Sequence, residues 1–137
     1  MNDYFHLTLS PREVNAVSAL GLAHIGDGVF ELMVRAYLCC EGHSKAGELH
    51  RLTVSYVSAP SQARFCTALL PLLDEQEQAF YRRGYNTHPH MIPKNASKHE
   101  YACATGLEAL FGALYLLGET DRLNELFSRL MEARHAV

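Results

Sequence analysis

The sequence predicts an all-α fold, and three observations support this prediction. Apolar residues recur at helical spacing in several segments, whereas no run of alternating apolar and polar residues indicates a β-strand. Residues typical of helix starts and helix ends separate these segments. The chain has 137 residues, 48% of them apolar and 20% charged, which is typical of globular proteins. We therefore expect one helical domain over residues 1–137.

The first helix is expected to begin at the segment Ser10-Pro11-Arg12-Glu13. Serine caps a helix, proline suits the first turn, and a glutamate three residues after the serine completes a capping box. Helical periodicity then continues to about Cys40, with a possible break near Leu20-Gly21, and Gly42 supplies a stop.

Five further helices follow from the same signals. They are expected at residues 45–56, from 58 to about 70, at 74–84, at 101–117 and at 121–135. Pro71 is expected to end the third helix of the chain, and Gly118 to end the helix before the last. Residues 85–97 contain two prolines and two asparagines without periodicity, so a long loop is expected there. Loops of this length in compact domains are usually functional or disordered.

The sequence also restricts where the protein works. The N-terminus lacks the basic-then-apolar order of a signal peptide, and no segment has the character of a membrane helix. The four cysteines form no CxxC pair, which indicates reduced thiols. We therefore expect a cytoplasmic protein without a membrane partner.

The net charge is −3, but the charges are unevenly distributed. Residues 78–99 contain no acid, and residues 49–73 contain none either, whereas both segments carry arginine and histidine. The acids gather in residues 74–77 and 119–132. One side of the molecule is therefore expected to be basic, and a nucleic-acid partner is not excluded by the net charge.

Asp27 is the first residue whose place is unusual. Two apolar stripes run along its helix, and Asp27 falls in the second, which comprises Leu20, Ala23, Phe30, Val34 and Leu38. Gly26 and Gly28 flank it, and each weakens a helix interior, which suggests that another backbone approaches closely. An aspartate on such a face needs a partner or a metal. A salt-bridged structural aspartate between two packing glycines is the alternative.

Glu108 is the second. It is the one charged residue between Tyr101 and Leu117, in a helix that is apolar on nearly all sides and so expected to cross the middle of the fold. Two such carboxylates repel one another if they meet without a cation. Mg²⁺, or alternatively Mn²⁺, would relieve this repulsion and can act on the phosphate oxygens of a substrate.

These residues also carry a family resemblance. Leu22-Ala23-His24-Ile25-Gly26-Asp27-Gly28-Val29 resembles the signature helix of ribonuclease III, and Thr105-Gly106-Leu107-Glu108-Ala109-Leu110-Phe111-Gly112 resembles its second acidic motif. Three intervening segments are similar to the Mini-ribonuclease III branch, which lacks the double-stranded-RNA-binding domain. They are Leu49-His50-Arg51 with Tyr56-Val57-Ser58-Ala59, then Arg82-Arg83-Gly84-Tyr85-Asn86, and Pro93-Lys94-Asn95-Ala96. The resemblance covers residues 14–130.

The resemblance implies a helical fold like the ribonuclease III endonuclease domain, a homodimer, and Mg²⁺-dependent hydrolysis of double-stranded RNA. It further implies maturation of the precursor of large-subunit (23S) ribosomal RNA in a bacterium or a plastid. Asp27 and Glu108 match the metal ligands, and both are expected to be catalytic. The further acidic positions of the full-length enzymes fall on Ala23 and Thr105, so one ion per protomer is expected.

Contacts with the RNA should go to phosphates and 2′-hydroxyls, since the A-form duplex is recognised by its shape. The candidates are Arg82, Arg83, Lys94 and Lys98, followed by His50, Arg51 and Asn95. A solvated basic surface is the alternative for each of them. Leu20, Phe30, Val34 and Leu38 are candidates for the dimer face, with the chain's own core as the alternative.

Three other functions are compatible with parts of this pattern. The first is a catalytically silent ribonuclease III-like RNA-binding protein in ribosome assembly, which would have lost Asp27 or Glu108. The second is a helical nucleotide phosphohydrolase of the histidine–aspartate type, which would need an adjacent His-Asp pair that the chain lacks. The third is a helical interaction module, which would not need isolated acids on apolar faces.

Overall fold

The computed structural model describes residues 2–87 and 97–135, so Lys94 and Asn95 lie outside the described residues. Within these ranges the secondary structure is helical and contains no strand, as predicted. The elements are α1 (Pro11–Asn15), α2 (Ala19–Cys40), α3 (Ala46–Val57), α4 (Ala59–Leu69), the 3₁₀ turn η1 (Leu70–Leu72), α5 (Glu75–Tyr85), α6 (Lys98–Leu117) and α7 (Thr120–His135).

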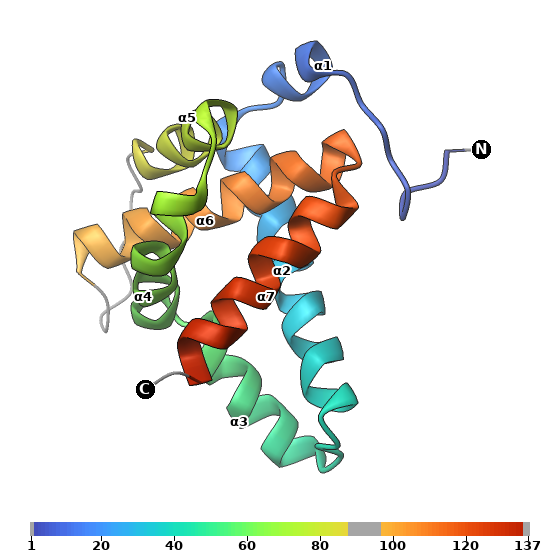
Figure 1. Ribbon diagram of the computed structural model, residues 1–137, viewed down its shortest axis with the longest axis vertical. Coiled ribbons are helices and arrows are strands. Elements are labelled where there is room, and N and C mark those ends of the chain that lie inside the picture. The colour runs from blue at the N-terminus through green and yellow to red at the C-terminus, as the bar shows by residue number, and fades with distance from the viewer. Residues whose placement is uncertain (1, 88–96, 136–137) are drawn as a thin grey trace.

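Helix α6 lies in the middle of the molecule. Helices α2, α4, α5 and α7 all pack against it, and α2 and α7 cross it in Figure 1. The ring of Phe30 on α2 marks the centre of the core, because it meets Phe65 of α4, Phe111 of α6 and Phe127 of α7 edge-on, at centroid distances of 6.1, 5.5 and 6.1 Å. The prediction that the helix around Glu108 crosses the middle of the fold is therefore confirmed.

The predicted break in the first helix occurs upstream of its expected place. The chain forms the short α1, and α2 starts afresh at Ala19, because the Ser18 hydroxyl accepts the N–H of Gly21 at 3.0 Å. The capping box of Ser10 with Glu13 is present as predicted. A serine cap thus decides where α2 begins, while Gly21 only follows it.

Two other boundaries can be compared with the prediction. Helix α4 ends at Leu69, just before Pro71 as predicted, and the turn η1 then runs through Leu72 with the proline in its first turn, where a missing N–H costs nothing. Helix α6 starts at Lys98 because Ser97 and Glu100 form a capping box. Helix α6 thus begins before Tyr101, the predicted start of this helix, and Lys98 lies in its first turn.

The second apolar stripe of α2 belongs mainly to the core of this chain. Phe30, Val34 and Leu38 are 0%, 1% and 2% exposed, whereas Leu20 is 65% exposed. The expectation that all four residues form a dimer face is therefore wrong for the three buried ones, since burial within one chain leaves them nothing to offer a partner. No helix of the described residues is long and apolar enough to span a membrane.

Candidate active site

Two glycines bring α2 and α6 into backbone contact. A Cβ atom added to Gly26 would lie 1.6 Å from the carbonyl oxygen of Glu108, and one added to Gly112 would lie 2.0 Å from the carbonyl oxygen of Leu22. The close approach predicted at Gly26 is thus confirmed. It is wrong for Gly28, where an added Cβ would meet no atom within 4 Å. The contact at Gly26 places its neighbour Asp27 beside Glu108.

The carboxyl groups of Asp27 and Glu108 face each other at this crossing. Burial, followed by the hydrogen bond to Asp27 and the charge of Asp27, raises the pKa of Glu108 to about 9. Glu108 is partly buried and Asp27 is exposed, so Asp27 does not lie on a buried face as the sequence suggested. The pair therefore has one enclosed member and one that opens to solvent, which is an arrangement that can admit a ligand.

The pair fits a hard divalent cation. Two carboxyl groups that face each other offer oxygen ligands whose mutual repulsion a cation would remove. Among residues 2–87 and 97–135, no group of three or more His, Cys, Asp or Glu side chains could hold a metal. Asp27 and Glu108 are sufficient for such a site, because Mg²⁺ commonly takes one or two carboxylates and completes its shell with water and substrate phosphates.

Ala23 and Thr105, the two positions at which the resemblance implied the loss of further acids, are buried in this structure. Ala23 is 7% exposed and Thr105 is 6% exposed. The Thr105 hydroxyl donates to the carbonyl oxygen of Tyr101 at 3.0 Å, a bond within α6. Neither residue is free to act as a ligand, which favours one ion per site.

Gln62 is a site residue that the sequence did not reveal. It lies on α4, is 1% exposed, and its amide lowers the pKa of Glu108 against the effects of burial and Asp27. The sequence does not distinguish Gln62, because it is a neutral polar residue within an ordinary helical segment. Only the packing of α4 on α6 shows its place.

The two adjacent arginines of α5 differ in their surroundings. Arg82 is exposed, whereas Nη2 of Arg83 donates to the carbonyl oxygen of Val17 at 2.6 Å. Nη1 of Arg83 is buried and has no hydrogen-bond partner among the described residues. Arg83 thus ties α5 to the start of α2, and its guanidinium is directed into the fold instead of toward a ligand.

Arg82 and the start of α6 lie around one cavity. This cavity of about 390 Å³ is lined by Arg82, Tyr85 and Asn86 from the end of α5 and by His99 from α6. Lys98, next to His99, is exposed. The structure therefore brings two of the predicted RNA-binding cations, Arg82 and Lys98, to the same part of the molecule.

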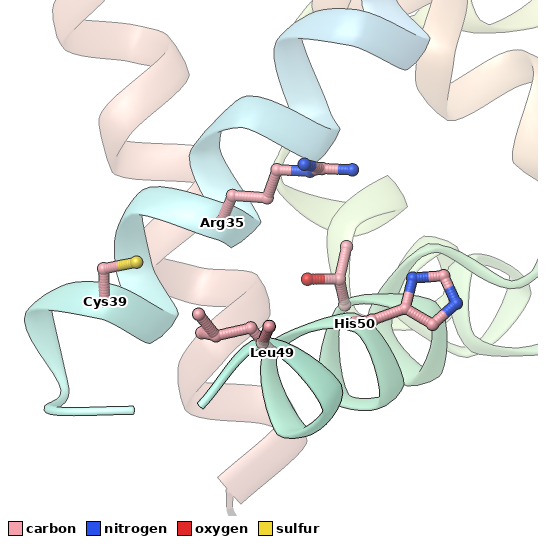
Figure 2. Close-up of a pocket in the computed structure, with 6 residues that line it drawn as sticks. Arg35, Cys39, Leu49 and His50 are labelled. Atoms are coloured by element: carbon pink, nitrogen blue, oxygen red, sulfur yellow. The ribbon is translucent and has the colours of Figure 1, made fainter. Parts of the chain in front are cut away.

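The remaining described candidates for RNA binding, His50 and Arg51, lie on α3. His50 and Arg51 are exposed, and His50 lines a cavity of about 270 Å³ between α2 and α3. Figure 2 shows that Arg35 and Cys39 reach this cavity from α2, opposite Leu49 and His50. Arg35 was not predicted to bind RNA. Its guanidinium contacts Glu31 at 3.1 Å, one helical turn beyond Asp27, so α2 connects the carboxylate pair with this cavity.

A sequence model of the ribonuclease III domain matches residues 20–119, which includes both acidic residues. The chain belongs to the ribonuclease III family. It is 46% identical over 107 residues to the Mini-ribonuclease 3 of Symbiobacterium thermophilum, covering 78% of this chain and 82% of the relative. It is 40% identical over 119 residues to that of Enterococcus faecalis, covering 85% and 90%.

A solved structure agrees with this assignment. The crystal structure of a Fusobacterium nucleatum protein superimposes with a TM-score of 0.80 at 27% identity, over 88% of this chain and 92% of that one. The fold is thus the one predicted from the resemblance. As a Mini-ribonuclease III, the protein is an endoribonuclease of the ribonuclease III type.

Proposed function

We propose that this ribonuclease hydrolyses phosphodiester bonds in double-stranded RNA with Mg²⁺ held by Asp27 and Glu108. The observation that supports this most is the meeting of the two carboxyl groups at the glycine contact of α2 and α6. Mn²⁺ should substitute for Mg²⁺, since both are hard cations that prefer oxygen ligands. We propose further that residues 1–137 act as one nuclease domain.

The two acids have different tasks in this scheme. When bound, the cation would polarise a phosphoryl oxygen and lower the pKa of a water molecule. Glu108, enclosed between helices, supplies a ligand whose position is fixed by the backbone contact at Gly26. Asp27 is exposed and so lies where a phosphate of the RNA can reach the pair. No side chain is needed as a general base.

The RNA is proposed to lie along the exposed cations on either side of the acids. Arg82 and Lys98 would contact phosphates at one end, and His50, Arg51 and Arg35 at the other. Lys94 and Asn95, which lie outside the described residues, remain candidates from the sequence. Arg83 is better assigned to the fold because its guanidinium bonds to Val17.

A homodimer is proposed to form over an apolar groove. The groove is about 470 Å³ and is lined by Tyr4, Phe5, Leu7, Ile25, Gly28, Val29, Leu32, Tyr115 and Leu116. Tyr4, Phe5 and Leu32 are 67%, 79% and 58% exposed. Large apolar side chains that are exposed together commonly mark an interaction surface. The open space at Gly28 would let a second copy approach the helix that carries Asp27.

The natural substrate is proposed to be the precursor of large-subunit (23S) ribosomal RNA. The similarity to bacterial proteins, such as those of Symbiobacterium thermophilum and Enterococcus faecalis, favours the cytoplasm of a bacterium over a plastid. A catalytically silent RNA-binding protein is the weaker candidate, because both acids are present and meet at one site.

Incubation of the purified protein with duplex RNA, with Mg²⁺ and with chelator, tests the proposal. Cleavage is expected with Mg²⁺ alone. Asp27→Asn and Glu108→Gln should each lower the rate by at least ~100-fold, because each removes a charge that holds the cation. Glu31→Gln, which removes an acid of α2 that pairs with Arg35, is the matched control. Near-normal turnover by either site variant would refute the assignment.

A further inference from the structure

Gln62 is the third side chain at the carboxylate pair. It belongs to the few polar residues that are buried in this fold, with 1% exposure. Its Nε2 atom is buried and has no hydrogen-bond partner of normal geometry within the described residues. An unpaired buried amide lowers the stability of a fold. The presence of Gln62 at this position therefore suggests a role other than stability.

The junction of α3 and α4 sets the direction of this side chain. Ser58 ends α3 and precedes α4, and its carbonyl oxygen accepts the N–H of Gln62 at 2.9 Å. The Ser61 hydroxyl donates to the carbonyl oxygen of Ser55 at 2.5 Å and accepts from Arg64 Nη2 at 3.0 Å. These bonds fix the first turn of α4, and they therefore fix the backbone position of Gln62.

The amide of Gln62 acts on Glu108. Helix α4 packs on α6, and the side-chain amide of Gln62 lies within hydrogen-bonding reach of the Glu108 carboxyl. An amide favours a charged carboxylate by donating a hydrogen bond to it. Nε2 nevertheless makes no bond of normal geometry, so the donor is adjacent to the carboxyl but not engaged.

We propose that Gln62 is a positioning residue, whose Nε2 donates to one Glu108 oxygen and so directs the other toward a cation shared with Asp27. This inference rests on the proposed metal site. Side chains that orient a metal ligand in this way typically change metal affinity or activity by 10–100-fold when they are removed.

The test is a Mg²⁺ titration of Gln62→Met, which keeps the length of the side chain and removes the donor. Thermal melts without RNA and cleavage of duplex RNA are followed as functions of Mg²⁺ concentration. The half-saturating concentration should rise about 10–100-fold in both assays. Cleavage should return toward the wild-type rate at saturating Mg²⁺, because the ligands themselves remain.

Cys66→Ala is the matched control, since Cys66 is buried on the same helix one turn further and its thiol donates to the carbonyl oxygen of Cys103 on α6. It should lower the melting temperature in chelator without moving the half-saturating concentration. Gln62→Met behaving like this control would overturn the inference. Gln62→Leu serves if the methionine variant does not fold, and loss of folding in both would also overturn it.

The same data separate this inference from the proposed function. If the wild type shows neither stabilisation nor cleavage with Mg²⁺, the metal site fails and the role of Gln62 fails with it. If the wild type depends on Mg²⁺ and Gln62→Met has the same half-saturating concentration, the positioning role alone is wrong.

Discussion

Glu77 and Glu108 show two ways in which this chain encloses a carboxylate. Glu77 is 4% exposed and accepts from Nε and Nη2 of Arg122 at 2.8 and 2.9 Å, and this pairing lowers its pKa. Glu108 instead faces another acid, and its pKa is raised. A buried carboxylate with a structural role, such as Glu77, is paired with a cationic side chain of the same fold. Within the part of the chain that the structure describes, no ion pair forms at Glu108, and a cation from outside would fill this place.

The raised pKa predicts how the stability of the metal-free protein depends on pH. Unfolded Glu108 releases its proton near 4.5, whereas the folded protein keeps it up to about 9. The folded state therefore binds more protons between these values, and its stability should fall as pH rises from about 4.5 to about 9. Thermal melts in chelator should show this fall for the wild type and a smaller one for Glu108→Gln.

Mg²⁺ should change the relative stability of the wild type and Glu108→Gln. In chelator Glu108→Gln should melt above the wild type at pH 8, because the amide removes the repulsion with little change of shape. In millimolar Mg²⁺ the wild type should gain more than the variant, as a ligand that binds the native state confers. A variant that melts below the wild type in chelator would show that Glu108 is a structural partner.

Arg82 and Arg83 allow a further prediction at the residue scale. Arg82→Gln combined with Lys98→Gln should weaken RNA binding and reduce the slope of log affinity against log salt by about 1–2, since fewer counterions are released. Arg83→Gln should instead lower the melting temperature, because it breaks the bond to Val17. Binding titrations at several salt concentrations check both, with Arg129→Gln on α7 as control. An unchanged slope in the double variant would leave Arg82 and Lys98 as a solvated surface.

At the scale of elements, the crossing of α2 and α6 is what creates the site. Each helix offers a glycine to the backbone of the other, Gly26 beneath Glu108 and Gly112 beneath Leu22. Gly84 and Gly106 do the same between α5 and α6, where an added Cβ would meet atoms of the facing helix at 2.5–2.9 Å. Glycine destabilises a helix relative to alanine, and here the close packing of the helices offsets that loss.

Gly26→Ala is expected to be severely destabilising. Its Cβ would lie 1.6 Å from a backbone oxygen, so the helices must separate, and overpacking of this kind costs about 1–3 kcal/mol or more. Gly47→Ala on α3 is the control, since nothing lies within 4 Å of its added Cβ and alanine is the better helix former. Denaturant unfolding measures both. Equal stability of Gly26→Ala and wild type would contradict the backbone contact.

For the whole molecule, the apolar groove and the uneven charge describe how copies and RNA would be arranged. The groove lies on the flank of α2 that carries Gly28 and Leu32, while the exposed cations proposed to bind RNA lie on α2 at Arg35, on α3, on α5 and at the start of α6. A dimer formed through the groove would place two copies of α2, each with its Asp27, near one another. Two sites in one assembly could then cut both strands of a duplex.

The homodimer is the prediction at this scale. Light scattering without RNA should give twice the monomer mass of 15.3 kDa at micromolar concentration. Leu32→Glu should shift the mass toward the monomer, because it places a charge in the groove. Val54→Glu alters another exposed apolar residue, on α3 outside the groove, and should leave the dimer intact. A wild type that scatters as a monomer would refute the dimer.

The sequence alone was sufficient for the fold class, for most helices and for the two acids. Capping residues, helical periodicity and an acid on an apolar face are local properties, so one segment at a time reveals them. Where the start of a helix differed from the prediction, a serine cap decided it, as with Ser18 for α2 and Ser97 for α6.

Only the tertiary structure decided which faces meet. An apolar stripe does not state whether it packs against its own chain or another, and the structure assigned Phe30 to the core and Leu32 to the surface. It separated Arg82 from Arg83, identical in sequence terms, by the reach of one guanidinium to Val17. It brought Gln62 to Glu108 across 46 residues of chain. Such contacts depend on how helices cross, and no local pattern encodes a crossing.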